Sequence, residues 1–225
     1  MRIQTSSRHS NLLSLLLCAL VFVCLGAPAA AAPTTIAYWN FNEGMGTDTR
    51  AKWSKQLPAS KGSGYIFLYG FRGGTEDYEG TSLNALPYVA AGASLTLVSG
   101  AGVSANGSSV LVAFSTEGLQ DVVVTFATRG TPLGMNEGHW EYSIDGISST
   151  PVGENTASNI REWGVETVDL SEIDEIDDQP YVFLRYQLDG AMATASNTRI
   201  DNLMVSAGGP VGSPGGTRCG DMDGD

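Results

Sequence analysis

The sequence predicts an all-β protein, an antiparallel β-sandwich of the jelly-roll type with one short helix. Three observations lead to this prediction. Short runs rich in β-branched and aromatic residues recur along the chain, and glycine-containing turns separate them. The long amphipathic helices that a parallel α/β fold needs do not occur in the pattern. The 28 glycines among 225 residues suit a fold of short strands and tight turns.

The first 32 residues are predicted to be a secretory signal peptide. Arg2 and Arg8 make the start positive, residues 12–25 form an apolar run, and residues 27–32 are small enough for cleavage. The apolar run is shorter than the roughly 20 residues that a membrane helix needs, so we expect no membrane insertion after cleavage. These features predict a protein that is secreted or held at the cell surface.

Charge and cysteine content narrow the range of partners. The sequence holds 24 acidic and 12 basic residues, a formal net charge of −12. An acidic surface disfavours nucleic acid and anionic membranes, and is compatible with divalent cations, with neutral polysaccharide or simply with solubility. Cys18 and Cys24 lie in the signal segment, so Cys219 alone stays in the mature chain. The fold must then rely on its hydrophobic core rather than on a disulfide.

The first part of the mature chain is predicted to alternate strands with polar loops. Residues 34–41 are β-branched and aromatic, which indicates the first strand. Residues 42–64 are predicted to form a long loop against the sandwich, and residues 73–86 another loop. Residues 65–71, between these loops, are either a second strand or a buried hydrophobic patch. Three β-rich runs follow, with glycine turns between them: residues 93–99, 109–115 and 121–129.

A hairpin is predicted next. Apolar side chains alternate in residues 139–144, as a strand with one buried face requires. Asp145 and Gly146 then form a two-residue hairpin turn, because glycine accepts the positive φ of such turns. Residues 148–152 return, and residues 163–170 form the next strand.

The helix is expected directly after that strand. Ser171 would cap its first turn, Ile173 and Ile176 would pack inward, and Pro180 would end it. The acidic run 172–178 is interpreted as the solvated face of a short connector rather than as a metal cluster. Two more strands, 181–188 and 198–206, close the domain, with apolar side chains near every second position: Val182, Leu184, Tyr186, Leu188, Ile200, Leu203 and Val205.

Four motifs of the predicted domain are distinctive: IAYWNFN at 36–42, FATRGT at 126–131, WEYSIDG at 140–146 and RIDNL at 199–203. Through these motifs the domain at 33–207 resembles secreted jelly-roll modules of planctomycete-like bacteria that precede dockerin-like or sorting tails. The resemblance implies the sandwich fold and carries no activity with it.

The C-terminal tail points to a larger protein. Residues 208–218 are a Gly/Pro linker by composition. After it, Asp221, Asp223 and Asp225 have the spacing of positions 1, 3 and 5 in an EF-hand-type calcium loop. Residues 219–225 therefore resemble the start of a dockerin-type repeat. The resemblance implies a truncated chain and a cohesin-like partner for its parent, whereas the alternative is an accidental acidic tail.

A structural calcium ion is a further implication of resemblance. In related carbohydrate-binding jelly rolls, an Asp on the closing strand and oxygens near the first strand often hold calcium. By that resemblance Asp201 would bind calcium together with Asn42 or Glu43. The alternative is that Asp201 and Asn202 hydrogen-bond the backbone at a strand edge.

Polysaccharide sites need aromatic rings for stacking and polar groups for hydroxyls. Trp39, Trp140 and Tyr142 lie in alternating strands and are expected in the core, whereas Tyr69, Tyr88 and Trp163 join a wider set of aromatic candidates. Residues in or near the polar loops are the better candidates for a ligand site: Trp53, Tyr78, Arg72, Asn84, Arg129 and Glu137.

An enzyme has little support in the sequence. His139 is the one histidine of the mature chain and is expected to be a hydrogen-bonding residue at a rim, and no nucleophile motif or metalloprotease motif accompanies it. Glu137 and Glu141 are a nominal carboxylate pair for glycoside hydrolysis.

We therefore expect a non-catalytic binding or spacer module of a larger extracellular protein, with carbohydrate as the expected class of ligand. The alternatives are a structural or adhesive surface domain without a glycan site, and a polysaccharide-degrading enzyme on a sandwich scaffold. An exposed aromatic platform would favour a binding module, and a flat polar surface would favour a spacer. Two carboxylates that face each other across a cleft would favour an enzyme.

Overall fold

The computed structural model describes residues 32–42, 56–71, 75–98, 105–156, 161–194 and 196–211, with the backbone alone at 75–78 and 154–156. The predicted signal segment (except residue 32), most of the linker and the calcium-loop start lie outside these ranges. Within them, no helix is long and apolar enough to span a bilayer.

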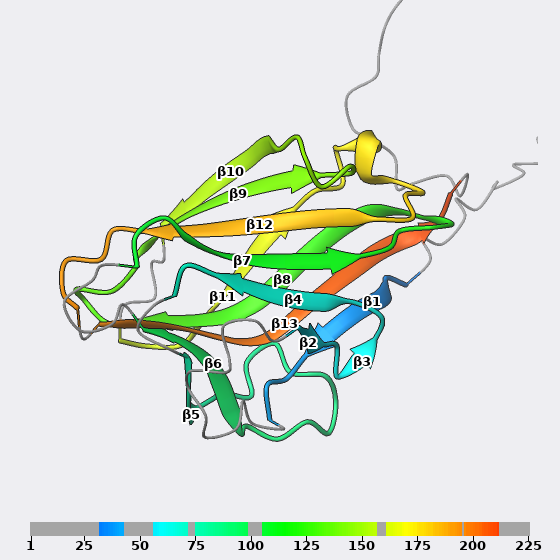
Figure 1. Cartoon of the computed structure of the whole chain (residues 1–225). Helices are drawn as coiled ribbons and strands as arrows, with labels where there is room; N and C mark the ends of the chain where they lie inside the picture. Colours follow the sequence, from blue (N-terminus) through cyan, green and yellow to red (C-terminus); the bar gives the residue numbers. More distant parts are fainter. Residues whose placement is uncertain are drawn as a thin grey trace, which may run out of the picture.

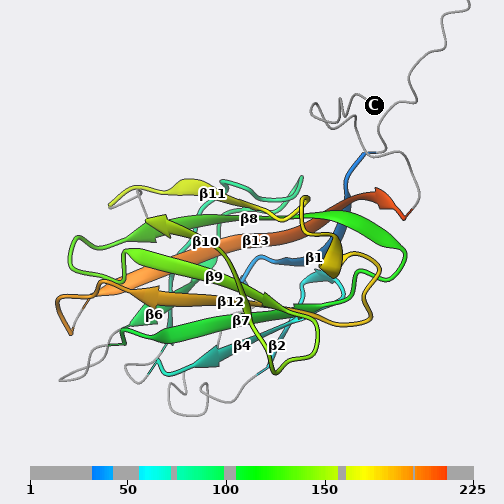
Figure 2. The ribbon, with the colours of Figure 1, turned by 90° about the horizontal axis from the view of Figure 1, so that it is seen from above.

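The described chain forms two antiparallel sheets, as the sequence predicted (Figure 1). One has seven strands in the order β11-β8-β13-β1-β3, with β6 on β13 and β5 on β6. The other has six, in the order β10-β9-β12-β7-β4-β2, and Figure 2 shows most of them side by side. The seven-stranded sheet contains β1 (Thr34–Trp39), β3 (Lys61–Gly62), β5 (Thr75–Glu79), β6 (Ala93–Val98), β8 (Leu119–Gly130), β11 (Gly164–Asp169) and β13 (Asn197–Pro210). The six-stranded sheet contains β2 (Leu57–Pro58), β4 (Tyr65–Tyr69), β7 (Ser108–Phe114), β9 (Glu137–Ser143), β10 (Thr150–Thr156) and β12 (Val182–Asp189).

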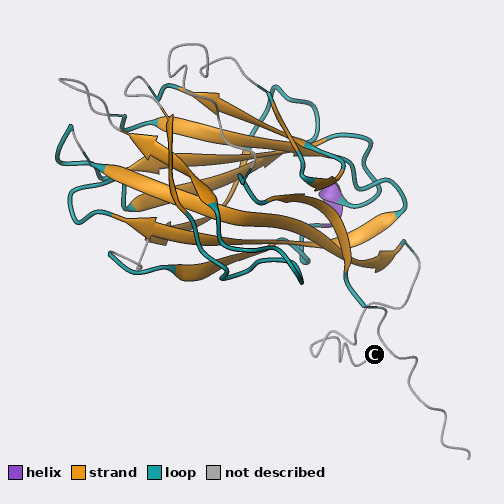
Figure 3. Ribbon diagram, turned by 90° about the horizontal axis from the view of Figure 1, so that it is seen from below, coloured by secondary structure: helices purple, strands orange, loops and turns teal. Residues whose placement is uncertain are grey.

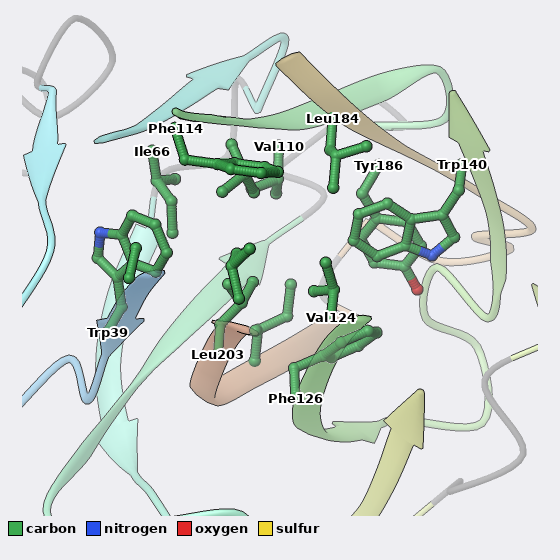
Figure 4. Close-up of a cluster of buried hydrophobic side chains, with 14 of the residues drawn as sticks. Trp39, Ile66, Val110, Phe114, Val124, Phe126, Trp140, Leu184, Tyr186 and Leu203 are labelled. Atoms are coloured by element: carbon green, nitrogen blue, oxygen red, sulfur yellow. The ribbon is translucent and has the colours of Figure 1, made fainter. Parts of the chain in front are cut away.

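The hydrophobic core lies between the sheets, where alternate side chains of both point inward (Figure 4). Trp39 and Trp140 are both buried, which confirms the prediction that they belong to the core, and Tyr142 packs against it. Trp140 stacks on Tyr186 with ring centroids 4.4 Å apart, and Phe126 of the opposite sheet lies 5.7 Å from each ring. This aromatic group joins the two sheets.

The closing strand β13 carries a β-bulge. The pairing of β13 with β8 shifts register between Asp201 and Met204, and Asn202 has a φ of 48°. A bulge inserts an extra residue and breaks the alternation of faces. Asp201, Asn202 and Leu203 are consequently buried in succession, which explains why the apolar positions skip from Ile200 to Leu203.

Two predicted loops contain short strands. Residues 42–64 include β2 and β3, and residues 73–86 include β5, which pairs with β6. All three have mainly polar or short sequences, so side-chain pattern could not reveal them. Backbone hydrogen bonds to a sheet edge form them instead.

The β9–β10 connection is also longer than predicted. β9 ends at Ser143 and β10 starts at Thr150, so the two-residue turn was wrong. Asp145 Oδ1 instead accepts hydrogen bonds from the backbone N–H groups of Ile147 (2.7 Å) and Ser148 (2.8 Å). These bonds lower the pKa of the Asp145 carboxyl and hold a wider Asx-type turn.

One short 3-10 helix, η2 (Asp174–Ile176), is the helical element of the described residues (Figure 3). Ile176 is buried, as predicted. The predicted Ser171 cap was wrong, because η2 starts after Ile173 and has no side-chain cap. The backbone N–H of Ser171 instead donates to Asp169 Oδ1 at 3.0 Å.

Candidate functional site

The outward face of the six-stranded sheet is the candidate site. Successive side chains of a strand point to opposite faces of the sheet. On β4, β7, β12 and β9, the residues that alternate with the core residues therefore point away from the core. Strand register aligns them in rows across the sheet, and one row runs from Phe67 through Leu111 and Arg185 to Glu141. The outward-facing set comprises Tyr65, Phe67, Tyr69, Ser109, Leu111, Ala113, Phe183, Arg185, Gln187, Asp189, Glu137, His139, Glu141 and Ser143.

Strand β4 carries three aromatic rings on this face. Tyr65, Phe67 and Tyr69 occupy alternate positions, so Tyr65 and Tyr69 lie about 13 Å apart along the strand at about 3.3 Å per residue. The side chains of Tyr65 and Tyr69 are 44% and 52% exposed. Phe183 adds a fourth, partly exposed ring two strands away, in the row of Tyr65. Aromatic faces are thus available to a ligand along one side of the sheet.

Two hollows lie on the same outward face, near the edge formed by β9 and β10. A hollow of about 200 Å³ is lined by Leu111, Phe183, Arg185, Glu141 and residues of the β9–β10 connection. A second, of about 570 Å³, is lined by His139, Glu141, Gln187 and residues of β10. Glu141 lines both, so the hollows adjoin at this residue.

The polar groups of the face are arranged in pairs. Arg185 Nη1 lies 3.5 Å from Glu141 Oε2 and donates a hydrogen bond to it. Gln187 Nε2 donates to Asp189 Oδ2 at 3.2 Å. In the register of β12 and β9, Arg185 lies opposite Glu141 and Gln187 opposite His139. Donors and acceptors therefore stand beside the aromatic rings, a combination that suits hydroxyl-rich ligands.

The nominal catalytic carboxylates share this face but not a catalytic spacing. Glu137 and Glu141 lie on the same side of β9, four residues apart, which corresponds to about 13 Å along a strand. Glycosidases hold their two carboxyl groups about 5–10 Å apart across the scissile bond. Glu141 also pairs with Arg185. The arrangement gives this pair no glycosidase geometry.

The outward face of the seven-stranded sheet has a different character, because residues 80–92 lie over it. Asn202 Nδ2 donates to the carbonyl oxygens of Thr81 (2.7 Å) and Leu83 (2.9 Å). Asn202 Oδ1 accepts a hydrogen bond from the hydroxyl of Tyr38, which in turn accepts from the backbone N–H of Leu86. Burial raises the pKa of the Tyr38 hydroxyl. These contacts fix the 80–92 loop on β1 and β13.

Asp201 lies beneath the same loop. Its Oδ2 accepts from the Thr81 N–H (2.7 Å) and its Oδ1 from the Asn202 N–H (2.8 Å), the hydrogen bonding expected as the alternative to calcium. Burial raises the pKa of this carboxyl to about 6. Gly80 packs against Asp201 and is hydrogen-bonded to Gly92, which Asn42 contacts.

Asn42, the second residue of the predicted calcium site, donates from Nδ2 to the carbonyl oxygen of Ala90 at 3.1 Å. Asp201 and Asn42 border the two hydrogen-bonded glycines that close the 80–92 loop. Glu43 lies outside the described residues. Among the described residues, no group of three or more His, Cys, Asp or Glu side chains is clustered to hold a metal ion. Calcium at Asp201 stays a prediction.

The remaining sequence-predicted ligand residues fall in different places. Asn84 donates to Thr125 Oγ1 (3.0 Å) and to the Asn202 carbonyl (2.7 Å), so it anchors the 80–92 loop. Arg129 lies on β8 of the seven-stranded sheet, opposite Arg199, whereas Glu137 lies on the candidate face. Tyr78 belongs to β5, but its side chain is not described, and Trp53 and Arg72 lie outside the described residues, as do Asp221, Asp223 and Asp225.

Sequence reasoning missed most of the face. It considered Tyr69, Glu137, His139 and Glu141 one by one, without placing them on a common surface. The residues that it did not consider are Tyr65, Phe67, Leu111, Phe183, Arg185 and Gln187. The signal that could have revealed them is the alternation of side chains along each predicted strand. An aromatic residue that lies between two core positions of a strand points to the opposite, outward face.

Fold and surface together define a β-sandwich module with an exposed aromatic face. No family model and no curated protein matches the sequence. Similar solved structures include a xylan-binding module, CBM15, at 12% identity and a TM-score of 0.42, over 69% of this chain and 97% of that one.

Two further solved structures are similar to the same extent. One is the CBM22-1 xylan-binding domain from Paenibacillus barcinonensis, at 10% identity and a TM-score of 0.41, covering 80% of this chain and 99% of that one. The other is the K3 adhesin domain of Lys-gingipain from Porphyromonas gingivalis, at 13% identity and a TM-score of 0.43. That comparison covers 79% of this chain and 100% of the adhesin domain. At these scores the similarity carries no argument about function, which must rest on this chain's own surface.

Proposed function

We propose that the outward face of the six-stranded sheet binds a carbohydrate polymer, and that the domain is a non-catalytic binding module of an extracellular protein. The observation that carries the proposal is the set of aromatic side chains on β4, of which Tyr65 and Tyr69 are exposed, on the same face of the sheet as two hollows. Polar side chains contribute to the lining of both hollows: Arg185, Glu141, His139 and Gln187. Sugar rings stack on aromatic faces through their apolar C–H surfaces, while their hydroxyls need donors and acceptors.

The geometry favours an extended ligand over a small one. The aromatic rings lie on β4, whereas His139 and Glu141 lie on β9, three strands away in the sheet order β9-β12-β7-β4. Adjacent strands are about 4.8 Å apart, so the two groups are separated by about 14 Å. One monosaccharide cannot contact both, but a chain of sugars laid across the strands can.

The test is retention of the purified protein on insoluble polysaccharides and in native gels that contain soluble ones. We expect retention by at least one polymer. Replacing Tyr65 and Tyr69 by Ala together should weaken that binding about 30-fold, on the basis of about 1 kcal/mol for each lost stacking contact. The matched control is Tyr88→Ala, because Tyr88 is a fully exposed tyrosine of the 80–92 loop, on the other sheet.

Retention that Tyr88→Ala abolishes and the double variant leaves unchanged would place the ligand elsewhere and contradict the proposal. Retention by none of the polymers would also contradict it and would favour the structural or adhesive domain. Hydrolysis of a retained polymer would instead support the enzyme.

We propose in addition that the protein is exported and that it binds calcium. The positive, apolar and small-residue pattern of residues 1–32 supports secretion. The spacing of Asp221, Asp223 and Asp225 supports a dockerin-like calcium loop with a cohesin-like partner for a longer parent. The place of Asp201 beside the glycines that Asn42 contacts supports a second calcium site. Urea denaturation at pH 7 with calcium and with EDTA would test the last of these, because Asp201 lies under the 80–92 loop and away from the proposed binding face.

A further inference from the structure

The centre of the candidate face is occupied by one ion pair, Arg185 and Glu141. Arg185 lies in the middle of β12, opposite Leu111 on β7 and Glu141 on β9. The guanidinium thus has an apolar neighbour on one side and a carboxylate on the other. The side chains of Arg185 and Glu141 are 46% and 28% exposed, so both are accessible to a ligand.

The pair leaves hydrogen-bonding capacity on both partners. The contact joins Nη1 to Oε2 at 3.5 Å, which is a single, long interaction rather than a bidentate one. A guanidinium has five N–H donors and a carboxylate has about four acceptor positions. Neighbouring hydroxyls of a sugar could therefore accept from Arg185 and donate to Glu141 at the same time, where the two hollows adjoin.

The charge around the pair disfavours an anionic ligand. Among the outward-facing side chains described on β4, β7, β9 and β12, Arg185 carries the one positive charge, against the carboxylates of Glu137, Glu141 and Asp189. Glu141 lies directly against the guanidinium and neutralises it locally. The whole chain is also acidic, with a net charge of −12. A ligand carboxylate placed on Arg185 would meet Glu141 and a negative field.

We propose that the Arg185–Glu141 pair makes this face selective for neutral polysaccharides and excludes polymers of uronic acids. The inference rests on the proposed function of the face and adds the substrate class. Glu141 is the specificity-determining residue: its carboxylate neutralises the charge of the guanidinium and repels the carboxylate of a uronate, which an unpaired arginine would bind well.

Native gels that contain either neutral polysaccharides (glucan, mannan, galactan and xylan) or polygalacturonate test the proposal. The protein should be retarded by at least one neutral polymer at least about 10-fold more strongly than by polygalacturonate. Glu141→Gln keeps the shape and removes the charge, so polygalacturonate binding should strengthen about fivefold, as expected when one exposed ion pair is released. That gain should fall with added salt and disappear in the double variant Glu141→Gln/Arg185→Met.

The matched control is Glu137→Gln, which removes the same charge from the same face of β9 without touching the Arg185 pair. It should change polygalacturonate binding less than about twofold. Equal gains from Glu137→Gln and Glu141→Gln would show a general field effect and overturn the local mechanism. Thermal unfolding of each variant establishes that it is folded.

The outcomes separate this inference from the proposed function. Retardation of the protein by polygalacturonate as strong as by any neutral polymer, and dependent on Tyr65 and Tyr69, would keep the carbohydrate site and overturn its selectivity. Retardation by no polymer would contradict the proposed function itself, and the inference with it. Neutral selectivity that Glu141→Gln does not relax would show that Glu141 is not the determinant.

Discussion

The outward faces of the two sheets use similar side chains for opposite purposes. On the seven-stranded sheet, the hydroxyl of Tyr38 and the amide of Asn202 are buried under residues 80–92 and hydrogen-bonded to that loop. On the six-stranded sheet, Tyr65 and Tyr69 stand exposed beside polar groups. The role of an outward-facing tyrosine therefore depends on whether another segment covers it. A covered tyrosine stabilises the fold, and an uncovered one is available to a ligand.

This comparison yields a rule for mutations on the two faces. Substitutions under the 80–92 loop should change the free energy of unfolding and leave ligand binding unchanged in the folded protein. Substitutions on the six-stranded face should do the reverse.

The largest expected effect is on Asn202. Asn202→Ala removes two donated bonds to the carbonyl oxygens of Thr81 and Leu83, and leaves the buried hydroxyl of Tyr38 without its acceptor. We expect the free energy of unfolding to fall by roughly 3–5 kcal/mol, and the positive φ of Asn202 adds to the penalty for Ala. Urea denaturation measures it, and a loss below about 1 kcal/mol would contradict the role of this residue.

The second effect is a pH dependence from Asp201. Its pKa in the folded protein is raised from 3.8 to about 6 by burial, so the folded state holds the proton more tightly than the unfolded chain. This contribution to stability is complete below about pH 4 and is lost as the pH rises through about 6, up to about 3 kcal/mol in all. Urea denaturation between pH 4 and 7 in EDTA measures it.

Asp201→Asn is the control for that dependence and should remove the loss between pH 4 and 6. The lowered pKa of the exposed Asp145 acts below its ordinary value of 3.8, outside this window. If calcium binds the ionised Asp201, adding calcium should restore stability at pH 7. Stability that rises from pH 4 to 6 in EDTA, and does so only with Asp201 present, would contradict the assignment.

The third effect is on binding alone. The Tyr65→Ala/Tyr69→Ala variant, expected to weaken polysaccharide binding about 30-fold, should change the free energy of unfolding by no more than about 1 kcal/mol, because both rings are largely exposed. Urea denaturation beside the binding assay measures both. Loss of binding together with a large loss of stability would show that these rings are structural.

The smallest effect is on Thr125, which accepts a hydrogen bond from Asn84 Nδ2. Thr125→Val keeps the shape and the branching of the side chain and removes the acceptor. Asn84 keeps its bond to the Asn202 carbonyl, so we expect a loss of only about 1 kcal/mol in the free energy of unfolding. Polysaccharide binding should be unchanged in this variant, because Thr125 lies on the seven-stranded sheet. Weakened binding would contradict the claim that the two faces act independently.

Much of the sandwich was predictable from the sequence. The alternation in residues 181–188 and the β-branched runs of the middle of the chain predicted β12, β6, β7 and β8 close to their observed bounds. The strands β2, β3 and β5 were not predictable, because they are held by backbone pairing at sheet edges. Asn202 was singled out as a backbone hydrogen-bonder, but its bulge depends on the partner strand β8.

The candidate site was less predictable than the fold. The sequence predicted ligand residues in polar loops such as 73–86, whereas in the structure Asn84 anchors the 80–92 loop. The aromatic face is assembled by the register of β4, β7, β12 and β9, strands far apart in the sequence. Pairing across strands is a tertiary property, so a single sequence could give the parity of Tyr65 and Arg185 but not their common surface.

The most direct test of the central claim is an amide-resolved NMR titration with a soluble oligosaccharide of whichever polymer retains the protein. Our account predicts shift changes concentrated on β4, β7, β12 and β9, including Tyr69, Arg185 and Glu141, with little change around Asn84 and Arg129. Shift changes concentrated on the 80–92 loop and β8, with the six-stranded face unaffected, would contradict it.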